Sequence, residues 1–151
     1  MDETTIKVKG KWVYLYRAVD KYGETIDFLL CSRRDVNAAK AFFNKAITEN
    51  GCPEKINIDK SGANTAGIKA INKENDTSIE IRQNKYLNNR IEGDHRFIKK
   101  IVRPMLGFKS FHSAKQTLSG IETVHMIKKG QLENVPDNLS IYRQVVSLIA
   151  A

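Results

Sequence analysis

The sequence has little cysteine, little proline and no long apolar run. Its two cysteines, Cys31 and Cys52, do not have the spacing of a metal site, so a zinc-binding or disulfide-stapled protein is not indicated. No stretch reaches the roughly 18 apolar residues of a transmembrane helix, and residues 1–10 lack the pattern of a signal peptide. These absences predict an intracellular protein with no membrane partner.

Positive charge is concentrated in one third of the chain. Residues 82–129 hold eleven Lys and Arg against three Asp and Glu, which accounts for the whole net charge of +8. A concentrated positive field attracts nucleic acid phosphates and makes their binding depend on salt. The other interpretation, a basic surface that only keeps the protein in solution, is open at this point.

The pattern of apolar residues predicts an α/β protein. Period-two alternation and β-branched residues predict strands over residues 2–9, 12–20, 25–31, 55–59 and 77–82. Longer periodicity predicts helices over residues 36–49, 64–73, 86–102 and 110–129. Asp35 is expected to cap the first of these helices, which ends near Gly51.

This order of elements favours the ribonuclease H-like fold. Three strands joined by hairpins, followed by strands that alternate with helices, predict a mixed five-stranded sheet flanked by helices. We expect this core over residues 1–104, and a C-terminal helical extension packed on the same domain over residues 105–151.

The helix predicted over residues 86–102 has a charged face and an apolar face. At about 100° per residue, Glu92 is the only acid on the charged face. That face comprises Lys85, Asn88, Glu92, Arg96, Lys99 and Arg103. An acid among cations suggests a metal ligand beside a bound polyanion. The alternative is an ordinary amphipathic helix whose charges are solvated.

Two further carboxylates are placed to join Glu92. Asp2 falls on the apolar face of the first strand, whereas Glu3 points the other way. Asp59 follows a strand at its carboxyl end, where open α/β sheets collect ligands. Grouped carboxylates repel one another unless a hard cation such as Mg²⁺ or Mn²⁺ binds them. Asp94 lies about 160° around the helix from Glu92 and is the poorer partner.

Several short blocks resemble, in order, the catalytic domain of a bacterial insertion-sequence transposase. They are Asp2-Glu3-Thr4, Gly10-Lys11-Trp12, Tyr14–Asp20, Arg33-Arg34-Asp35, Ile58-Asp59-Lys60, Lys85–Asn89, Ile91-Glu92, Asp94-His95-Arg96 and Gly120–Thr123. The resemblance is to the DDE transposases of the insertion-sequence-six family and extends to about residue 130. The block KYLNN, followed by IE and DHR, is its most specific part.

The resemblance implies both a site and a reaction. It places the catalytic, metal-binding acids at Asp2, Asp59 and Glu92, with two Mg²⁺ or Mn²⁺ ions, and implies cleavage and strand transfer of transposon DNA. The family's basic residue about two turns after the glutamate falls at Lys99, with Arg96 as a second candidate. The expected DNA contacts are Lys85, Asn88, Arg96, Lys99 and Arg103. A homodimer in the bacterial cytoplasm, associated with the nucleoid, is also implied.

Two other functions are weighed against this one. Family members carry an N-terminal DNA-binding region, usually helix-turn-helix, and none precedes Met1. One alternative is therefore a truncated, inactive remnant that folds and binds DNA or a full-length partner. The other is a cellular ribonuclease H-like nuclease that cuts RNA–DNA hybrids. The sequence departs from the family at Thr5, usually aromatic, and at Gly93, usually Gln.

Aromatic residues and a histidine near the expected site receive structural interpretations. Trp12, Tyr14 and Tyr16 alternate along one strand, and we interpret them as sheet packing rather than base-stacking platforms. His95 lies at the edge of the apolar stripe and is interpreted as a packed, hydrogen-bonded residue rather than a metal ligand.

Overall fold

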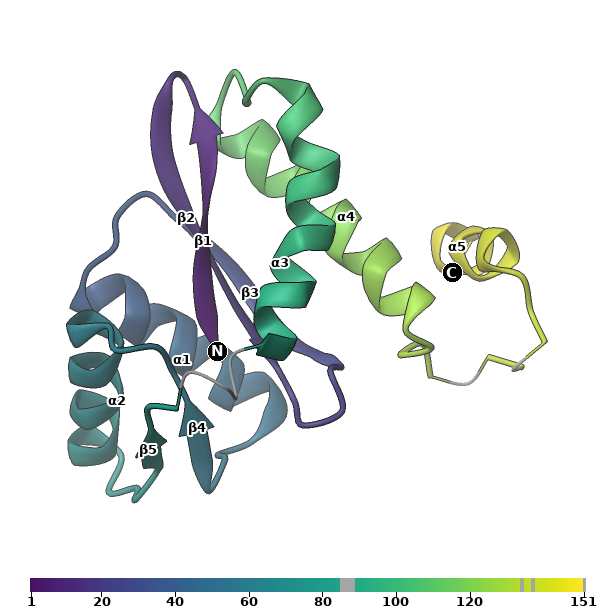
Figure 1. The fold of residues 1–151 in the computed structure, drawn as a ribbon. Coiled ribbons are helices and arrows are strands. Elements are labelled where there is room, and N and C mark those ends of the chain that lie inside the picture. Colours follow the sequence, from purple (N-terminus) through teal and green to yellow (C-terminus); the bar gives the residue numbers. More distant parts are fainter. Residues whose placement is uncertain (85–88, 134, 137, 151) are drawn as a thin grey trace.

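A computed structural model describes residues 1–84, 89–133, 135–136 and 138–150. Its first sheet is antiparallel and has the order β1-β2-β3 (Figure 1). The strands are β1 (Asp2–Val8), β2 (Lys11–Val19) and β3 (Thr25–Cys31). The register places Asp2 opposite Arg17, and the hairpin between β1 and β2 turns at Gly10, whose φ of 75° suits glycine.

The second part of the fold alternates helices and short strands. It comprises α1 (Val36–Asn50), β4 (Lys55–Asn57), α2 (Gly62–Glu74) and β5 (Glu80–Arg82), and the two strands pair in parallel. The predicted cap of α1 is confirmed, because the side chain of Asp35 accepts a hydrogen bond from the Ala38 N–H at 2.9 Å. The helix ends at Gly51, as predicted, with a φ of 84°.

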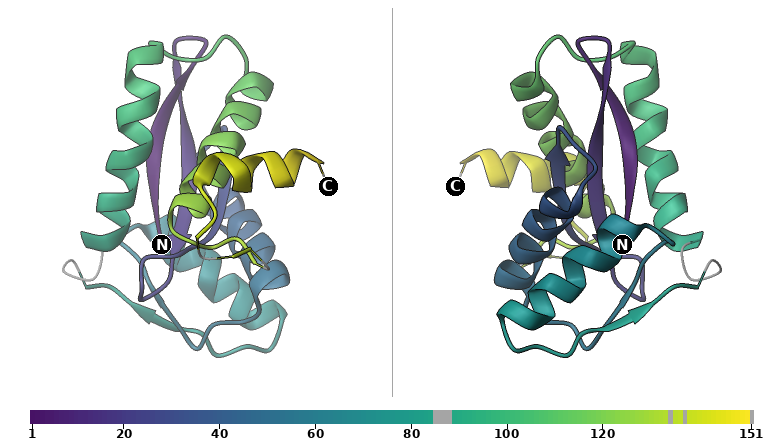
Figure 2. Two further views of the ribbon diagram at one scale, coloured as in Figure 1. Left: turned by 90° about the vertical axis from the view of Figure 1, so that its right-hand side faces the viewer. Right: turned by 90° about the vertical axis from the view of Figure 1, so that its left-hand side faces the viewer.

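The last third of the chain is helical. It comprises α3 (Asn89–Val102), the short 3₁₀ helix η2 (Arg103–Met105), α4 (Phe111–Lys128) and α5 (Ile141–Ala150). α3 and α4 lie against the three-stranded sheet, whereas α5 projects away from it (Figures 1 and 2). None of the described helices combines the length and the apolar character that crossing a bilayer requires.

Alternation along the strands divides the core into two clusters. On one face, Tyr16 of β2 stacks on Phe42 of α1 with ring centroids 5.8 Å apart, and α2 closes this cluster. On the other face, Leu15 packs with Ile98 of α3 and Leu118 of α4. Full burial of a side chain of this size stabilises the fold by about 1.5–3 kcal/mol. The sheet therefore lies between α1 and α2 on one side and α3 and α4 on the other.

The sheet differs in one respect from the expected five-stranded arrangement. Among the described residues, β1–β3 and β4–β5 form separate hydrogen-bonded ladders. The two ladders meet where the Met1 ammonium group donates to the Asn57 carbonyl at 2.8 Å. β1 begins at Asp2, beside the last residue of β4. The two strands therefore meet end to end and do not run side by side.

The aromatic residues of β2 do not all pack in the sheet. Tyr16 is fully buried and Tyr14 packs against the first cluster, so the packing interpretation is confirmed for both. It is wrong for Trp12, which is 60% exposed. Trp12 lies at the hairpin end of β2, opposite Lys7, and the helix α1 covers the other end of the sheet (Figure 1).

A buried ionic network joins β2 to α3 and α4. Arg17 has no exposed surface, and its guanidinium donates to Glu122 of α4 at 2.6 and 2.9 Å and to Asp94 of α3 at 2.8 Å. Asp94 also pairs with Lys129 at 2.8 Å and with the His125 ring at 2.9 Å. Burial alone raises the pKa of Asp94, but the hydrogen bonds from Lys129 and His125 and the charge of Arg17 outweigh it and lower that pKa. The network fixes how α3 is rotated against the sheet.

Removal of one acid from this network is expected to destabilise the protein strongly. In Glu122→Gln the buried Arg17 loses its bidentate partner, and the free energy of unfolding should fall by about 3 kcal/mol. Urea unfolding with an unchanged m-value measures this loss. Glu133→Gln, at an exposed acid with no ion pair in the described part of the chain, is the control and should change stability little. Equal stability of the two variants would contradict the assigned role of the network.

Candidate active site

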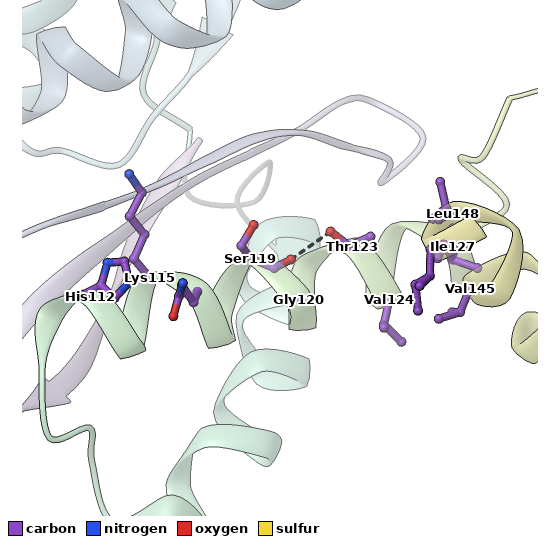
Figure 3. A pocket seen from close by; sticks show the side chains of 11 residues that line it. His112, Lys115, Ser119, Gly120, Thr123, Val124, Ile127, Val145 and Leu148 are labelled. Atoms are coloured by element: carbon purple, nitrogen blue, oxygen red, sulfur yellow. Dashed lines mark hydrogen bonds between the residues drawn. The ribbon is translucent and has the colours of Figure 1, made fainter. Parts of the chain in front are cut away.

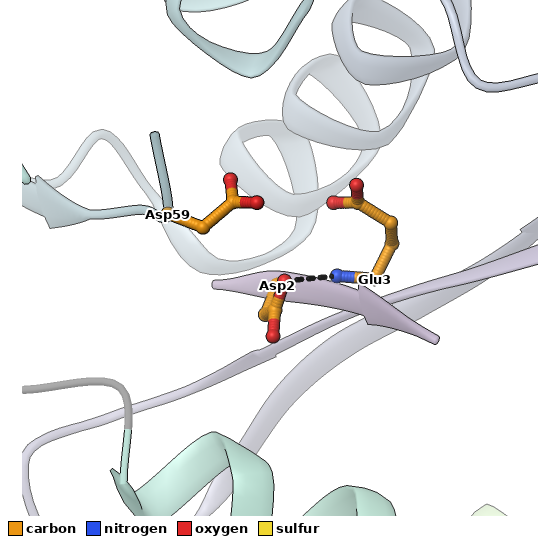
Figure 4. Close-up of side chains that lie close together, drawn as sticks. All are labelled: Asp2, Glu3 and Asp59. Carbon is orange, nitrogen blue, oxygen red and sulfur yellow. Dashed lines mark hydrogen bonds between the residues drawn. The ribbon is translucent and has the colours of Figure 1, made fainter. Parts of the chain in front are cut away.

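Three carboxylates gather where β1 begins and β4 ends. One carboxylate oxygen each from Asp2, Glu3 and Asp59 lie within 4.8 Å of one another. Asp2 and Glu3 are the first residues of β1, and Asp59 comes two residues after the end of β4. Figure 4 shows Glu3 and Asp59 pointing toward each other, with Asp2 turned to the opposite side of the strand. The predicted pair of Asp2 and Asp59 is thus brought together, and a third acid joins it.

Asp2 faces α3. Its carboxylate accepts a hydrogen bond from the Glu3 backbone N–H at 2.8 Å and lies 3.6 Å from Nε2 of His95. Burial alone raises the pKa of Asp2, but the His95 ring and the Glu3 N–H outweigh it and lower the pKa. His95 is buried, as predicted. Its expected hydrogen bond is not formed among the described residues, since 3.6 Å exceeds hydrogen-bond length and neither ring nitrogen has another partner there.

Glu3 is the acid that sequence reasoning missed. Asn64, which is fully buried, donates from Nδ2 to Glu3 at 2.9 Å and to Asp59 at 3.3 Å. Arg34 forms ion pairs with both of these acids. Burial raises the pKa of Glu3, although Asn64 and Arg34 oppose the rise. The alternation of side chains along β1 correctly predicted that Glu3 points away from the face of Asp2. It did not indicate that Asp59 lies on the side toward which Glu3 points.

The donor set of this cluster suits a hard divalent cation. All three groups offer carboxylate oxygens, which are the ligands that Mg²⁺ and Mn²⁺ prefer. Oε1 of Glu3 is buried and forms an ion pair with Nε of Arg34. The Arg34 side chain is 44% exposed, so it is a counter-charge that a metal ion can displace.

Glu92 is not part of this cluster. It is an exposed residue in the first turn of α3 and is not among the acids that meet within 4.8 Å. Its neighbour one turn further along, His95, is the residue of α3 that faces Asp2. Residues three apart on a helix have Cβ atoms about 5–6 Å apart. Glu92 therefore borders the part of α3 that faces Asp2, whereas Asp94 is engaged in the Arg17 network.

The predicted DNA contacts are only partly visible. Lys85 and Asn88 lie outside the described residues. Arg96 and Arg103 are exposed and Lys99 is half-buried, and none of the three has an ion pair among the described residues. Their positive charges extend from Glu92 toward the end of α3 and η2.

A separate cavity of about 600 Å³ lies between α4 and α5 (Figure 3). Its described lining includes Lys115, Ser119 and Thr123 of α4 and Val145 and Leu148 of α5, without an Asp or Glu. It therefore offers no carboxylate for metal chemistry, and the cluster at β1 and β4 remains the candidate active site.

Comparison with known proteins identifies relatives of this chain. The family model for a DDE domain matches residues 1–131. The transposase for insertion sequence-like element IS431mec of Staphylococcus aureus is 42% identical over an alignment of 133 residues, with 85% of this chain and 57% of that transposase covered. The same values hold for the transposase of insertion sequence element IS257 in transposon Tn4003 of S. aureus. The chain thus spans little more than half the length of the curated relatives it matches.

Solved structures with the same fold are retroviral integrase cores. The HTLV-2 integrase catalytic core domain in complex with magnesium, in its trimeric form, has a TM-score of 0.62 at 17% identity and covers 94% of this chain and 90% of that one. The dimeric form has a TM-score of 0.61 at 18% identity, with 93% and 89% covered. These likenesses confirm the predicted ribonuclease H-like fold. The match of the family model over residues 1–131, with the 42% identity to the S. aureus transposases beside it, shows that the chain belongs to the DDE domain family of insertion-sequence transposases.

Proposed function

We propose that this chain is the catalytic region of a transposase that cleaves DNA and joins the cut strand to target DNA by metal-dependent chemistry. The observation that carries the proposal is the meeting of Asp2 and Asp59, from distant parts of a DDE-family chain, at the edge of a ribonuclease H-like sheet. Glu92, an exposed residue one helical turn before His95, is the third acid of the proposed set.

In this proposal Asp2, Asp59 and Glu92 hold two Mg²⁺ or Mn²⁺ ions. Such ions activate the attacking oxygen and stabilise the leaving oxygen of a phosphodiester. Arg34 balances the charge of Glu3 and Asp59 and gives way at Asp59 when a cation binds. Asn64, fixed in the interior, keeps the Glu3 and Asp59 carboxylates oriented.

DNA is the proposed partner, and α3 is the proposed contact. Arg96, Lys99 and Arg103 bind phosphates, and by resemblance Lys85 and Asn88 continue this surface. Phosphate contacts position the duplex while the acids act on one strand. We further propose that the protein works as a homo-oligomer, as the integrase structures described as dimeric and trimeric forms suggest. A bacterial cytoplasm is the proposed location, since the matching transposases are those of Staphylococcus aureus.

Glu92→Gln is expected to abolish metal-dependent nicking of supercoiled plasmid. Loss of a metal ligand removes several kcal/mol of transition-state stabilisation, which lowers the rate roughly 100-fold or more. Glu3→Gln is the matched control, since it removes the same charge from an acid that is bound by Arg34 and Asn64. This variant should keep the nicking rate within about tenfold of the unmodified rate. The measurement is the first-order loss of supercoiled plasmid with Mn²⁺, beside urea unfolding of each variant.

The opposite ranking would contradict the proposed acid set. Nicking lost in Glu3→Gln and retained in Glu92→Gln would make Glu3 the third ligand. An unmodified chain that binds duplex DNA but never nicks it would favour the alternative of an inactive remnant.

Charge reversal at Lys99 is expected to weaken duplex binding and to reduce its dependence on salt. Each phosphate contact contributes about 0.9 to the slope of log affinity against log salt, so Lys99→Glu should lower that slope by roughly 1. Fluorescence anisotropy of a labelled duplex between about 50 and 200 mM salt measures it. Lys69→Glu, an exposed lysine of α2 on the other side of the sheet, is the matched control. Equal slopes in the two variants would refute the phosphate contact.

A further inference from the structure

A second cavity lies at the hairpin end of β1, remote from the acids. It has a volume of about 310 Å³ and is bounded by β1, the start of β2, the end of α3 and the loop that follows η2. Its lining includes Lys7, Trp12, Lys99, Arg103, Leu106 and Phe108. Two of these residues, Lys99 and Arg103, belong to the proposed phosphate contacts.

The loop that forms one wall is held firmly in place. Phe108 pairs with the free edge of β1, where its N–H donates to the Lys7 carbonyl at 2.8 Å and its carbonyl accepts from the Lys9 N–H at 2.8 Å. Gly107 has a φ of 108°, and a Cβ there would lie 3.1 Å from the Lys7 carbonyl oxygen, so the close approach requires glycine. Leu106, just before it, is 87% exposed at the rim.

The chemistry of the cavity combines an uncovered indole with unpaired cations. Trp12 keeps 60% of its surface exposed, although the next residue of β2, Val13, is buried. Lys7, Lys99 and Arg103 form no ion pair in the part of the chain that the structure describes. An exposed aromatic face among free cations is the combination that binds single-stranded nucleic acid, because the ring stacks on a base while the cations hold its phosphates.

The cavity lies within reach of a DNA strand held at the acids. Lys99 and Arg103 follow Glu92 by seven and eleven residues along the helix and its end, which corresponds to about 10 and 16 Å. Successive nucleotides of a strand are spaced by about 3.4 Å. The cavity is therefore roughly three to five nucleotides from a phosphate bound beside Glu92.

We propose that this cavity receives an unpaired base of the DNA strand, which stacks on Trp12 while Lys99 and Arg103 hold the flanking phosphates. The inference rests on the proposed function and assigns the DNA strand a second binding site, away from the acids that carry out the reaction. A second copy of the chain is the competing occupant, since Trp12 and Leu106 are apolar. Three cations around the cavity, none in an ion pair among the described residues, favour a polyanion over another copy of a chain whose net charge is +8.

Trp12 is the only tryptophan of the chain, so its fluorescence reports on this cavity alone. Titration with a thymidine oligonucleotide of about ten residues should quench the emission. An oligonucleotide of the same length with abasic sugars keeps the phosphates but offers no base, and it should bind roughly tenfold more weakly without quenching. Trp12→Leu should weaken binding of the thymidine strand by a similar factor, as read by anisotropy, and leave duplex binding unchanged.

Tyr22→Leu is the matched control. Tyr22 is 72% exposed on the turn between β2 and β3, away from the cavity, and this variant should bind both DNA forms like the unmodified chain. The inference would be overturned if the abasic strand quenched the emission equally, or if Trp12→Leu left single-strand binding unaltered. In either case, retained duplex binding would still support the proposed function. Absence of all DNA binding would overturn both. A dimer that Trp12→Leu converts to monomer would assign the cavity to a second copy instead.

Discussion

The buried guanidinium of Arg17 is the constraint on which the placement of the site depends. It extends from the second half of β2 into the buried layer between the sheet and the helices α3 and α4, where an unpaired charge is costly. Glu122 and Asp94 meet that charge from two different helices, so neither α4 nor α3 can rotate or slide without exposing it. Lys129 extends the network to the turn before β3 through the Gly23 carbonyl at 2.8 Å.

The consequence for function lies in the orientation of α3. With Asp94 turned inward, the helical period turns Glu92 outward and brings His95 against Asp2. The same rotation aligns Arg96 and Lys99 beyond Glu92, on the surface proposed to contact DNA. The network is therefore a positioning device: its own residues touch no proposed ligand, yet they decide which side chains of α3 lie on the face proposed to contact DNA.

Local patterns predicted most of the fold, whereas contacts between distant segments were harder to predict. The alternation in β1–β3 and the caps at Asp35 and Gly51 depend on neighbours in sequence, and the structure confirms them. Glu3 was missed because alternation along a strand assigns each side chain to a face but does not say which distant residue lies near that face. Asp59, which follows β4, is the distant residue near Glu3. The packing predicted for Trp12 was wrong because alternation along a strand does not show where the helix that covers the strand ends. Glu92 was selected by helix face and family resemblance, and its position beside the His95 contact agrees with that choice without testing it.

The most direct test of the central claim is the anomalous scattering of Mn²⁺ in crystals of this chain. The proposed acid set predicts manganese bound by carboxylate oxygens of Asp2 and Asp59, with Glu92 drawn toward the ion and Arg34 withdrawn from Asp59. Metal–oxygen distances close to those of octahedral Mg²⁺, about 2.0–2.2 Å, should accompany the peak. Manganese held by Glu3 and Asp59 with Glu92 left in solvent, or no manganese at these acids, would contradict the account.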